Sequence, residues 1–132
     1  MFVDKHGRHY FSDYKKGLFV TEDDIHNHMY QNQFYNPQSN KHLRGNKDRS
    51  LVWFKDGDHK VMVLYSLEEK VPKLLEIDLV VEGGIQDMVP YQTNKLFVVG
   101  RGGHIYLLKF EEENLDVVWE TQVEKRVSLV LT

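Results

Sequence analysis

Two stretches in the second half of the chain decide the fold: LVWFKDGDHKVMVLYSLEEKVPKLLEIDL (residues 51–79) and LFVVGRGGHIYLLKFEEENLDVVWETQV (residues 96–123). Each contains short runs rich in Val, Leu, Ile and aromatic residues, separated by turn-forming residues. Several runs are apolar at consecutive positions, which favours strands that are buried on both faces. Each stretch therefore predicts a strand, a glycine hairpin, a second strand, an acidic turn and a third strand.

The two stretches superpose when the chain is shifted by 45 residues, which places Gly57 on Gly102 and His59 on His104. A fourth strand can be drawn before each hairpin. A shift of 50 residues brings the N-terminal MFVDKHGRHYF onto the first stretch, with His9 on His59. The three Gly-x-His segments therefore predict one hairpin that occurs three times, because glycine supplies the positive φ of a tight turn. A shared metal site of these three histidines is the less favoured interpretation.

Repeats of about 45 residues, each with four short antiparallel strands, resemble β-propeller blades of the WD40 or Kelch type over residues 50–126. The resemblance implies an all-β fold of antiparallel, blade-like, four-stranded repeats, and it implies no particular activity. A ring needs at least four blades, so about two and a half repeats predict a partial propeller or one that is completed by oligomerisation. The alternatives are a small β-barrel and an α+β two-layer fold.

The sequence predicts a single domain over residues 1–132. An N-terminal β-hairpin is expected at residues 1–20 and a helical or irregular insertion at 21–49. The first blade-like repeat is expected at 50–94 and the second at 95–132.

The insertion begins with TEDDIHNHMYQNQFY (residues 21–35), which predicts a helix with Thr21 as its N-cap and acidic residues in the first turn. A long polar loop is expected to follow over residues 36–50. Loops on a rigid sheet scaffold often carry recognition, and Tyr and Arg dominate interface energetics. The expected partner-binding residues are Tyr30, Phe34, Tyr35, Arg44, Lys47 and Arg49. The function expected from this pattern is non-enzymatic: a protein–protein interaction module, such as a small inhibitor or assembly component, that binds through the insertion and the hairpin rims.

Two other functions stay open at this point. A metal-dependent hydrolase or nuclease would use His26, His28 and His42, although a helix would point the first two histidines in different directions. A nucleic-acid binder would use the basic loop at residues 41–49, against a formal net charge of −3 for the whole chain. No cofactor is expected.

Composition narrows the remaining classes. The 132 residues include no cysteine, which excludes disulfides and cysteine nucleophiles and suits the cytoplasm or the nucleus. We expect no signal peptide and no membrane association, because the longest apolar run is far shorter than the ~20 residues that span a bilayer. The apolar segment VSLVLT (residues 127–132) predicts a strand that needs a partner, so self-association through the terminal strands is expected.

Overall fold

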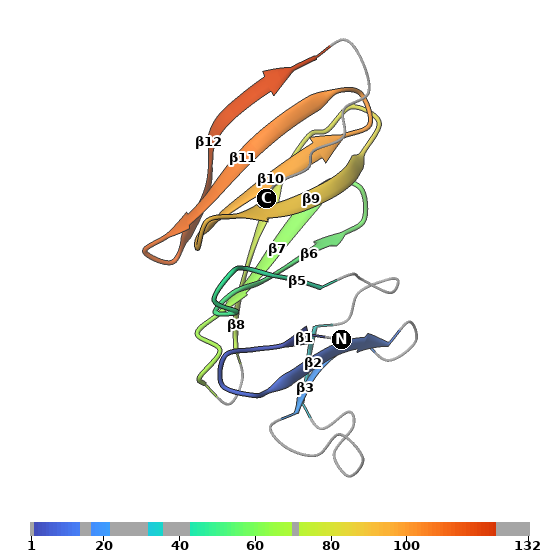
Figure 1. Cartoon of the computed structure of the whole chain (residues 1–132). Coiled ribbons are helices and arrows are strands. Elements are labelled where there is room, and N and C mark those ends of the chain that lie inside the picture. The colour runs from blue at the N-terminus through green and yellow to red at the C-terminus, as the bar shows by residue number, and fades with distance from the viewer. Residues whose placement is uncertain (1, 14–16, 22–31, 36–42, 70–71, 124–132) are drawn as a thin grey trace.

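The fold is known from a computed structural model, which describes residues 2–13, 17–21, 32–35, 43–69 and 72–123. These residues form twelve β-strands in three antiparallel sheets, and no helix occurs among them (Figure 1). The described part of the chain accordingly contains no helix long and apolar enough to cross a membrane. The predicted all-β class is confirmed, and none of the three sheets closes into a barrel.

Each sheet is a simple meander, in which every strand pairs with the strands before and after it in the chain. Sheet 1 contains β1 (Phe2–Val3), β2 (His9–Asp13), β3 (Gly17–Thr21) and β4 (Asn32–Tyr35). Sheet 2 contains β5 (Arg44–Gly45), β6 (Val52–Asp56), β7 (Lys60–Tyr65) and β8 (Lys73–Asp78). Sheet 3 contains β9 (Ile85–Tyr91), β10 (Lys95–Gly100), β11 (His104–Glu111) and β12 (Asn114–Gln122).

The prediction of a helix over residues 21–35 is wrong at both of its described ends. Thr21, the expected N-cap, is the last residue of β3, and Asn32–Tyr35 forms β4. The two strands pair antiparallel, with Phe19 opposite Gln33 and a register shift next to Leu18, so that pairing with a neighbouring strand prevails over a local helical tendency. The expected loop at 36–50 also contains a strand, β5, and residues 22–31 and 36–42 lie outside the described part of the chain.

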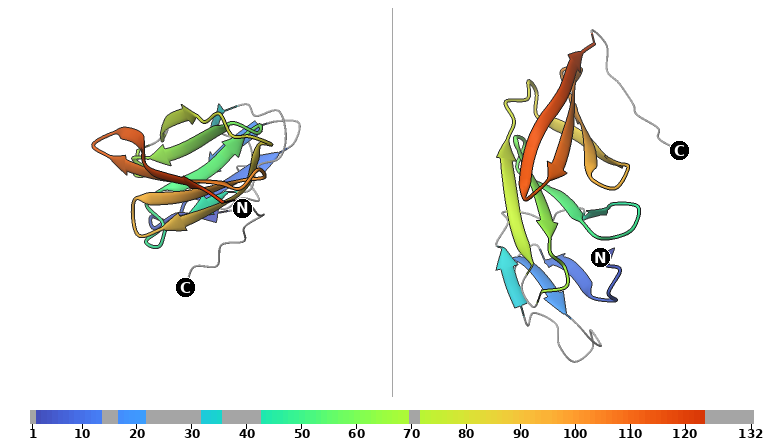
Figure 2. Two further views of the ribbon diagram at one scale, coloured as in Figure 1. Left: turned by 90° about the horizontal axis from the view of Figure 1, so that it is seen from above. Right: turned by 90° about the vertical axis from the view of Figure 1, so that its left-hand side faces the viewer.

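The sheets are stacked so that corresponding strands of sheets 2 and 3 lie side by side. β5 lies beside β9, and β8 lies beside β12. The turns at one end also meet, since the Lys5 amide donates to the Arg49 carbonyl at 3.1 Å and the Asn46 side-chain amide donates to the Thr93 carbonyl at 2.6 Å. The three sheets therefore follow one another along the molecule, with sheet 2 in the middle (Figures 1 and 2).

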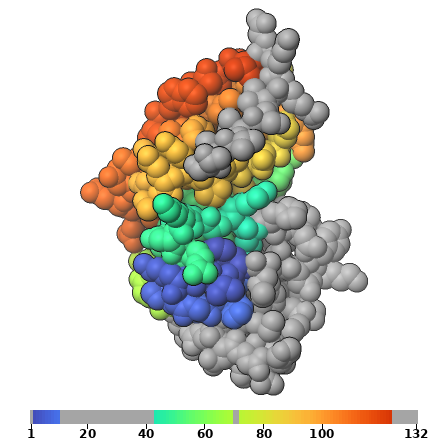
Figure 3. All heavy atoms as spheres, viewed as in Figure 1, coloured from blue at the N-terminus to red at the C-terminus, as the bar shows by residue number. Residues whose placement is uncertain are grey.

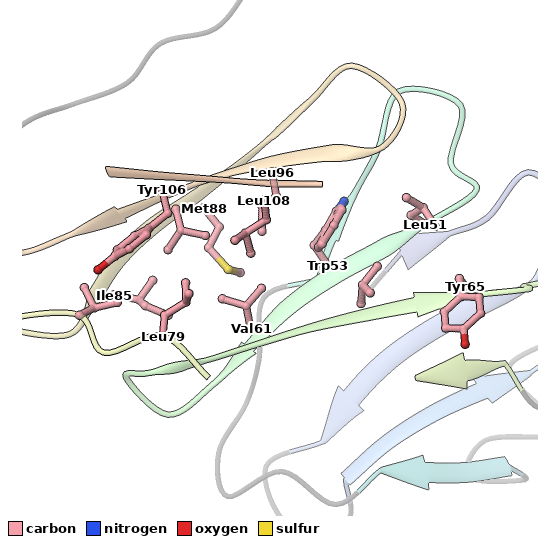
Figure 4. Packing of buried hydrophobic residues seen from close by; sticks show 13 residues of the cluster. Leu51, Trp53, Val61, Tyr65, Leu79, Ile85, Met88, Leu96, Tyr106 and Leu108 are labelled. Carbon is pink, nitrogen blue, oxygen red and sulfur yellow. The ribbon is translucent and has the colours of Figure 1, made fainter. Parts of the chain in front are cut away.

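This arrangement gives each sheet two distinct faces. We call the face that points toward the next sheet along the chain the front face, and the opposite face the back face. The front face of sheet 2 and the back face of sheet 3 share the larger apolar cluster, in which Trp53 and Val61 point toward Met88, Leu96 and Leu108 (Figure 4). Both Trp53 and Leu96 are completely buried.

The smaller cluster lies between sheets 1 and 2. Tyr10 of sheet 1 packs with Val52, Phe54 and Met62 from the back face of sheet 2. Gly45 is required at this junction, because a Cβ atom at its position would overlap the ring of Phe2. Sheet 2 is consequently buried on both faces, as the consecutive apolar residues of β6 and β7 predicted.

The face on which each residue packs shows the true offset, in residues, between sheets 2 and 3. Val52 and Leu96 both lie on back faces, and so do Met62 and Tyr106, which makes the structural offset 44 residues. The offset of 45 that the sequence suggested is wrong by one residue, and an error of one residue exchanges the two faces of a strand. His104 therefore corresponds to Lys60, and His59 does not occupy an equivalent position.

The first Gly-x-His hairpin also differs from the other two. It connects the first and second strands of sheet 1, whereas the hairpins of Gly57 and Gly103 connect the second and third strands of their sheets. The two later sheets begin one strand earlier than the expected repeats, so they span residues 44–78 and 85–122 instead of beginning at 50 and 95. The expected hairpin at residues 1–20 is part of a four-stranded sheet.

Candidate functional site

The β1–β2 turn of sheet 1 lies at one end of the stack, at the left of Figure 1, together with the turns of sheets 2 and 3 that connect first to second strands and third to fourth strands. We call this end the turn end. Turns from all three sheets meet there. The ring of Tyr65 at the end of β7 lies 4.9 Å from that of Phe110 at the end of β11, and Lys73 Nζ lies 3.3 Å from Glu113 Oε1. In the space-filling view the β5–β6 region lies between sheets 1 and 3 on the visible face (Figure 3).

A pocket of about 330 Å³ opens at the turn end. Its volume falls at the lower limit of sites that hold small ligands or single side chains. Leu51, Tyr65, Leu67 and Phe110 give it apolar surface, and Lys5, His6, Ser50, Ser66, Glu68 and Glu113 give it polar surface. Because these residues come from all three sheets, the pocket exists only when the sheets are stacked.

Charges of both signs line the pocket, and they come from different turns. Lys5 and His6 belong to the β1–β2 turn, whereas Glu68 belongs to the β7–β8 turn and Glu113 to the β11–β12 turn. The hydrogen bond to Glu113 raises the pKa of Lys73. The pocket therefore combines apolar surface with charged groups of both signs, and one of its carboxylates, Glu113, is already paired with Lys73.

Buried polar groups connect the β1–β2 turn to the β7–β8 turn at the turn end. Arg8 is 5% exposed, and its guanidinium donates hydrogen bonds to the carbonyls of Leu67 and Glu69 in the β7–β8 turn. Asp4 is 2% exposed, and it accepts hydrogen bonds from the Arg8 amide at 3.0 Å and from the Tyr10 hydroxyl at 2.7 Å. Burial, together with the hydrogen bond to Asp4, raises the pKa of Tyr10. These bonds fix the β1–β2 turn relative to sheet 2.

Asn46 has the same role one sheet further along. Its side-chain carbonyl accepts hydrogen bonds from the amides of Ser50 at 2.8 Å and Leu51 at 2.9 Å, which closes the β5–β6 turn. Its amide group reaches Thr93 in sheet 3. Asp4 and Asn46 therefore each form the turn of one sheet, and both contribute to the order of the turn end.

The backbone at the turn end is strained in a way that the opposite end is not. Among the residues that the structure describes, five other than glycine have positive φ, and these five lie in turns at the turn end: Arg49, Ser66, Gln92, Glu112 and Glu113. At the opposite end the described positive-φ residues are all glycines: Gly57, Gly83, Gly84 and Gly103. A side chain in this conformation costs roughly 1–2 kcal/mol relative to glycine. The turn end thus retains side chains at positions where glycine would be conformationally easier, which is typical of residues that have a function.

The partner-binding residues that the sequence predicted lie in different elements where the structure describes them. Lys47 and Arg49 are exposed in the β5–β6 turn, at the rim of the turn end. Arg44 lies in β5, where its guanidinium is 3.6 Å from the Asp87 carboxylate of β9. Phe34 and Tyr35 belong to β4, and Tyr30 lies outside the described residues.

The predicted metal ligands His26, His28 and His42 all lie outside the described residues. Within the described ranges, no group of three His, Asp or Glu side chains is placed to hold a metal ion. His104 stacks on Tyr106, with ring centroids 4.3 Å apart, and His59 Nδ1 accepts a hydrogen bond from the Val81 amide at 3.4 Å. Both of these hairpin histidines therefore have structural contacts.

Sequence reasoning missed the pocket. The acidic turns at 68–69 and 111–113 recur in both repeats, and acidic residues in exposed turns are common without a binding role. The sequence contained one signal for the pocket: each acidic turn follows a strand with an aromatic residue near its end, Tyr65 or Phe110. Nothing in the sequence indicated that the β1–β2 turn would lie next to them.

Comparisons with known proteins do not assign the chain to a group. No protein-family model matches the sequence, and no curated protein matches it.

Proposed function

We propose that the chain is a non-enzymatic protein-interaction module, built from consecutive β-propeller-like blades, and that it binds its partner at the turn end. The pocket of about 330 Å³ at the meeting point of three sheets is the observation that carries this proposal. Recognition residues are often placed on turns that a rigid sheet scaffold positions, and hydrogen bonds from Arg8 to Leu67 and from Asn46 to Thr93 connect these turns. A cytoplasmic or nuclear location and self-association of the chain belong to the same proposal.

The lining of the pocket defines the ligand that fits it best. Tyr65 and Phe110 provide an aromatic wall for one apolar side chain, and Glu68 and Glu113 suit a neighbouring Lys or Arg. A protruding loop or an extended peptide of the partner carries both groups within a few residues. Lys47 and Arg49, which the sequence predicts as contact residues of the 21–49 insertion, are exposed and extend the proposed contact surface beyond the pocket.

The proposal can be tested by selecting binding peptides from a displayed random library on the immobilised chain. We expect the selected peptides to share an apolar residue close to Lys or Arg. The variants Glu68→Lys and Glu113→Lys should each weaken binding by about tenfold or more, because each replaces an attraction by a repulsion. Glu82→Lys is the matched control, since Glu82 is an exposed carboxylate at the opposite end and its replacement should leave the affinity unchanged.

Two results would refute the proposed site. The first is a failure to enrich any peptide that binds the folded chain. The second is a set of peptides whose affinity is the same for the Glu68→Lys, Glu113→Lys and Glu82→Lys variants, because such peptides would bind elsewhere.

A further inference from the structure

The front face of sheet 3 is apolar, and no described sheet packs on it. The strand register places Val89, Phe97, Leu107 and Trp119 side by side across the four strands of this face. Trp119 is 48% exposed, and the first three are half-buried. Tyr91 extends the patch along β9, with its ring 5.3 Å from that of Phe97 and 37% of its surface exposed.

This row corresponds to the row through which sheet 2 packs on sheet 3. In sheet 2 the register aligns Arg44, Trp53, Val63 and Leu75 across the four strands. Trp53 and Val63 are completely buried against the back face of sheet 3. The same front-to-back packing joins Tyr10 of sheet 1 to the back face of sheet 2. The open face of sheet 3 is thus a third copy of a packing surface that the molecule already uses twice.

We propose that this face binds a second copy of the chain, and that it packs on the back face of the second copy's sheet 1. The back-face positions of the second and third strands are matched in all three sheets. They are held by the register pairs Phe11–Phe19 in sheet 1, Phe54–Met62 in sheet 2 and Val98–Tyr106 in sheet 3. The pairs in sheets 2 and 3 receive the front face of the preceding sheet, and sheet 1 carries an equally apolar pair at the same register.

The packing is head to tail, so two copies form two identical junctions and close a ring of six sheets. A heterologous contact of this kind either closes into a ring or grows into a filament, and six blades lie within the range of known propellers. Face packing also explains why the edge strand β12 has a β-bulge next to Leu107, since a bulge disfavours edge-to-edge pairing. This inference does not depend on the pocket at the turn end.

The first test is the molar mass of the full chain by light scattering after size exclusion. We expect twice the 15.6 kDa mass of one chain. Leu107→Glu should weaken the dimer by about hundredfold or more, because it buries an unpaired charge in the junction. Trp119→Glu is a second variant at a more exposed position, and far-ultraviolet circular dichroism should show that both variants stay folded. Val80→Glu is the control, because Val80 is 93% exposed and lies away from this face. A monomer throughout a concentration series would overturn the proposal.

The second test distinguishes head-to-tail packing from other dimers. Because the chain has no cysteine, Trp119→Cys and Gln33→Cys each introduce a single thiol. Trp119 lies in the fourth strand of sheet 3 and Gln33 in the fourth strand of sheet 1, and the fourth strands of sheets 2 and 3 lie side by side within the chain. A short bismaleimide should therefore link a mixture of the two variants and should not link either variant alone. Cross-linking of Trp119→Cys to itself would indicate that two copies of sheet 3 pack on each other, and it would refute the proposed arrangement.

Discussion

The two junctions between the sheets have different chemistry. The junction of sheets 2 and 3 contains thirteen buried apolar residues in one cluster, including Trp53, Leu96 and Leu108. The junction of sheets 1 and 2 has six such residues among those described, and it adds the buried Asp4 and Arg8. Burial of apolar area is nondirectional, whereas buried hydrogen bonds fix one geometry and are costly to leave unmade. The first junction is therefore stabilised mainly by apolar burial, and the second also contains hydrogen bonds that orient the turn lining the pocket.

The largest expected effect is at the apolar junction. Trp53→Ala should lower the free energy of unfolding by about 3–5 kcal/mol, because it leaves a cavity at the centre of the larger cluster. Chemical denaturation followed by circular dichroism measures this loss. Trp53→Phe is the matched control and should cost much less, since it keeps an aromatic ring and removes an indole N–H that is buried without a hydrogen-bond partner. Equal losses for the two variants would mean that ring packing is not what Trp53 contributes.

The polar junction should respond more weakly to its central substitution. Arg8→Met keeps most of the side-chain volume and removes the donors to the carbonyls of Leu67 and Glu69. We expect a loss of about 2–3 kcal/mol in the free energy of unfolding, because one buried and one partly buried carbonyl lose a charged donor. The affinity of turn-end peptides should fall as well, since Leu67 lines the pocket. A variant with unchanged stability and unchanged peptide binding would show that the guanidinium does not order the β7–β8 turn.

These differences indicate how far the sequence could be interpreted. The strands of sheets 2 and 3 were predictable, because their apolar runs are long and their hairpins are marked by Gly57 and Gly103. The offset between them was not, since shifts of 44 and 45 residues align equally apolar runs and only the packing faces distinguish the two. The pocket was hidden for a related reason. It depends on contacts between turns that are distant in the chain, such as the bonds from Arg8 to residues 67 and 69.

The smallest expected effect also distinguishes the junctions by their response to pH. Burial raises the pKa of Tyr10, and the hydrogen bond to Asp4 adds to the shift, so the folded state favours the protonated phenol. Its contribution to stability is complete below the ordinary tyrosine pKa of about 10 and is lost as the pH rises above that value, because the unfolded chain then releases the proton first. Tyr10→Phe should cost about 1 kcal/mol at neutral pH, where one hydrogen bond is lost.

Between pH 10 and 11, the wild-type chain should lose up to about 1.4 kcal/mol more of its unfolding free energy than the Tyr10→Phe variant. Tyr106→Phe is the comparison in the apolar junction. Burial also raises the pKa of Tyr106, but its hydroxyl donates to the Val80 carbonyl at 3.1 Å instead of to a carboxylate. We therefore expect a smaller change in the alkaline slope for Tyr106→Phe, measured by urea denaturation at a series of pH values. Equal slopes for the two variants would remove the distinction between the junctions, because the charge of Asp4 would then have no measurable role.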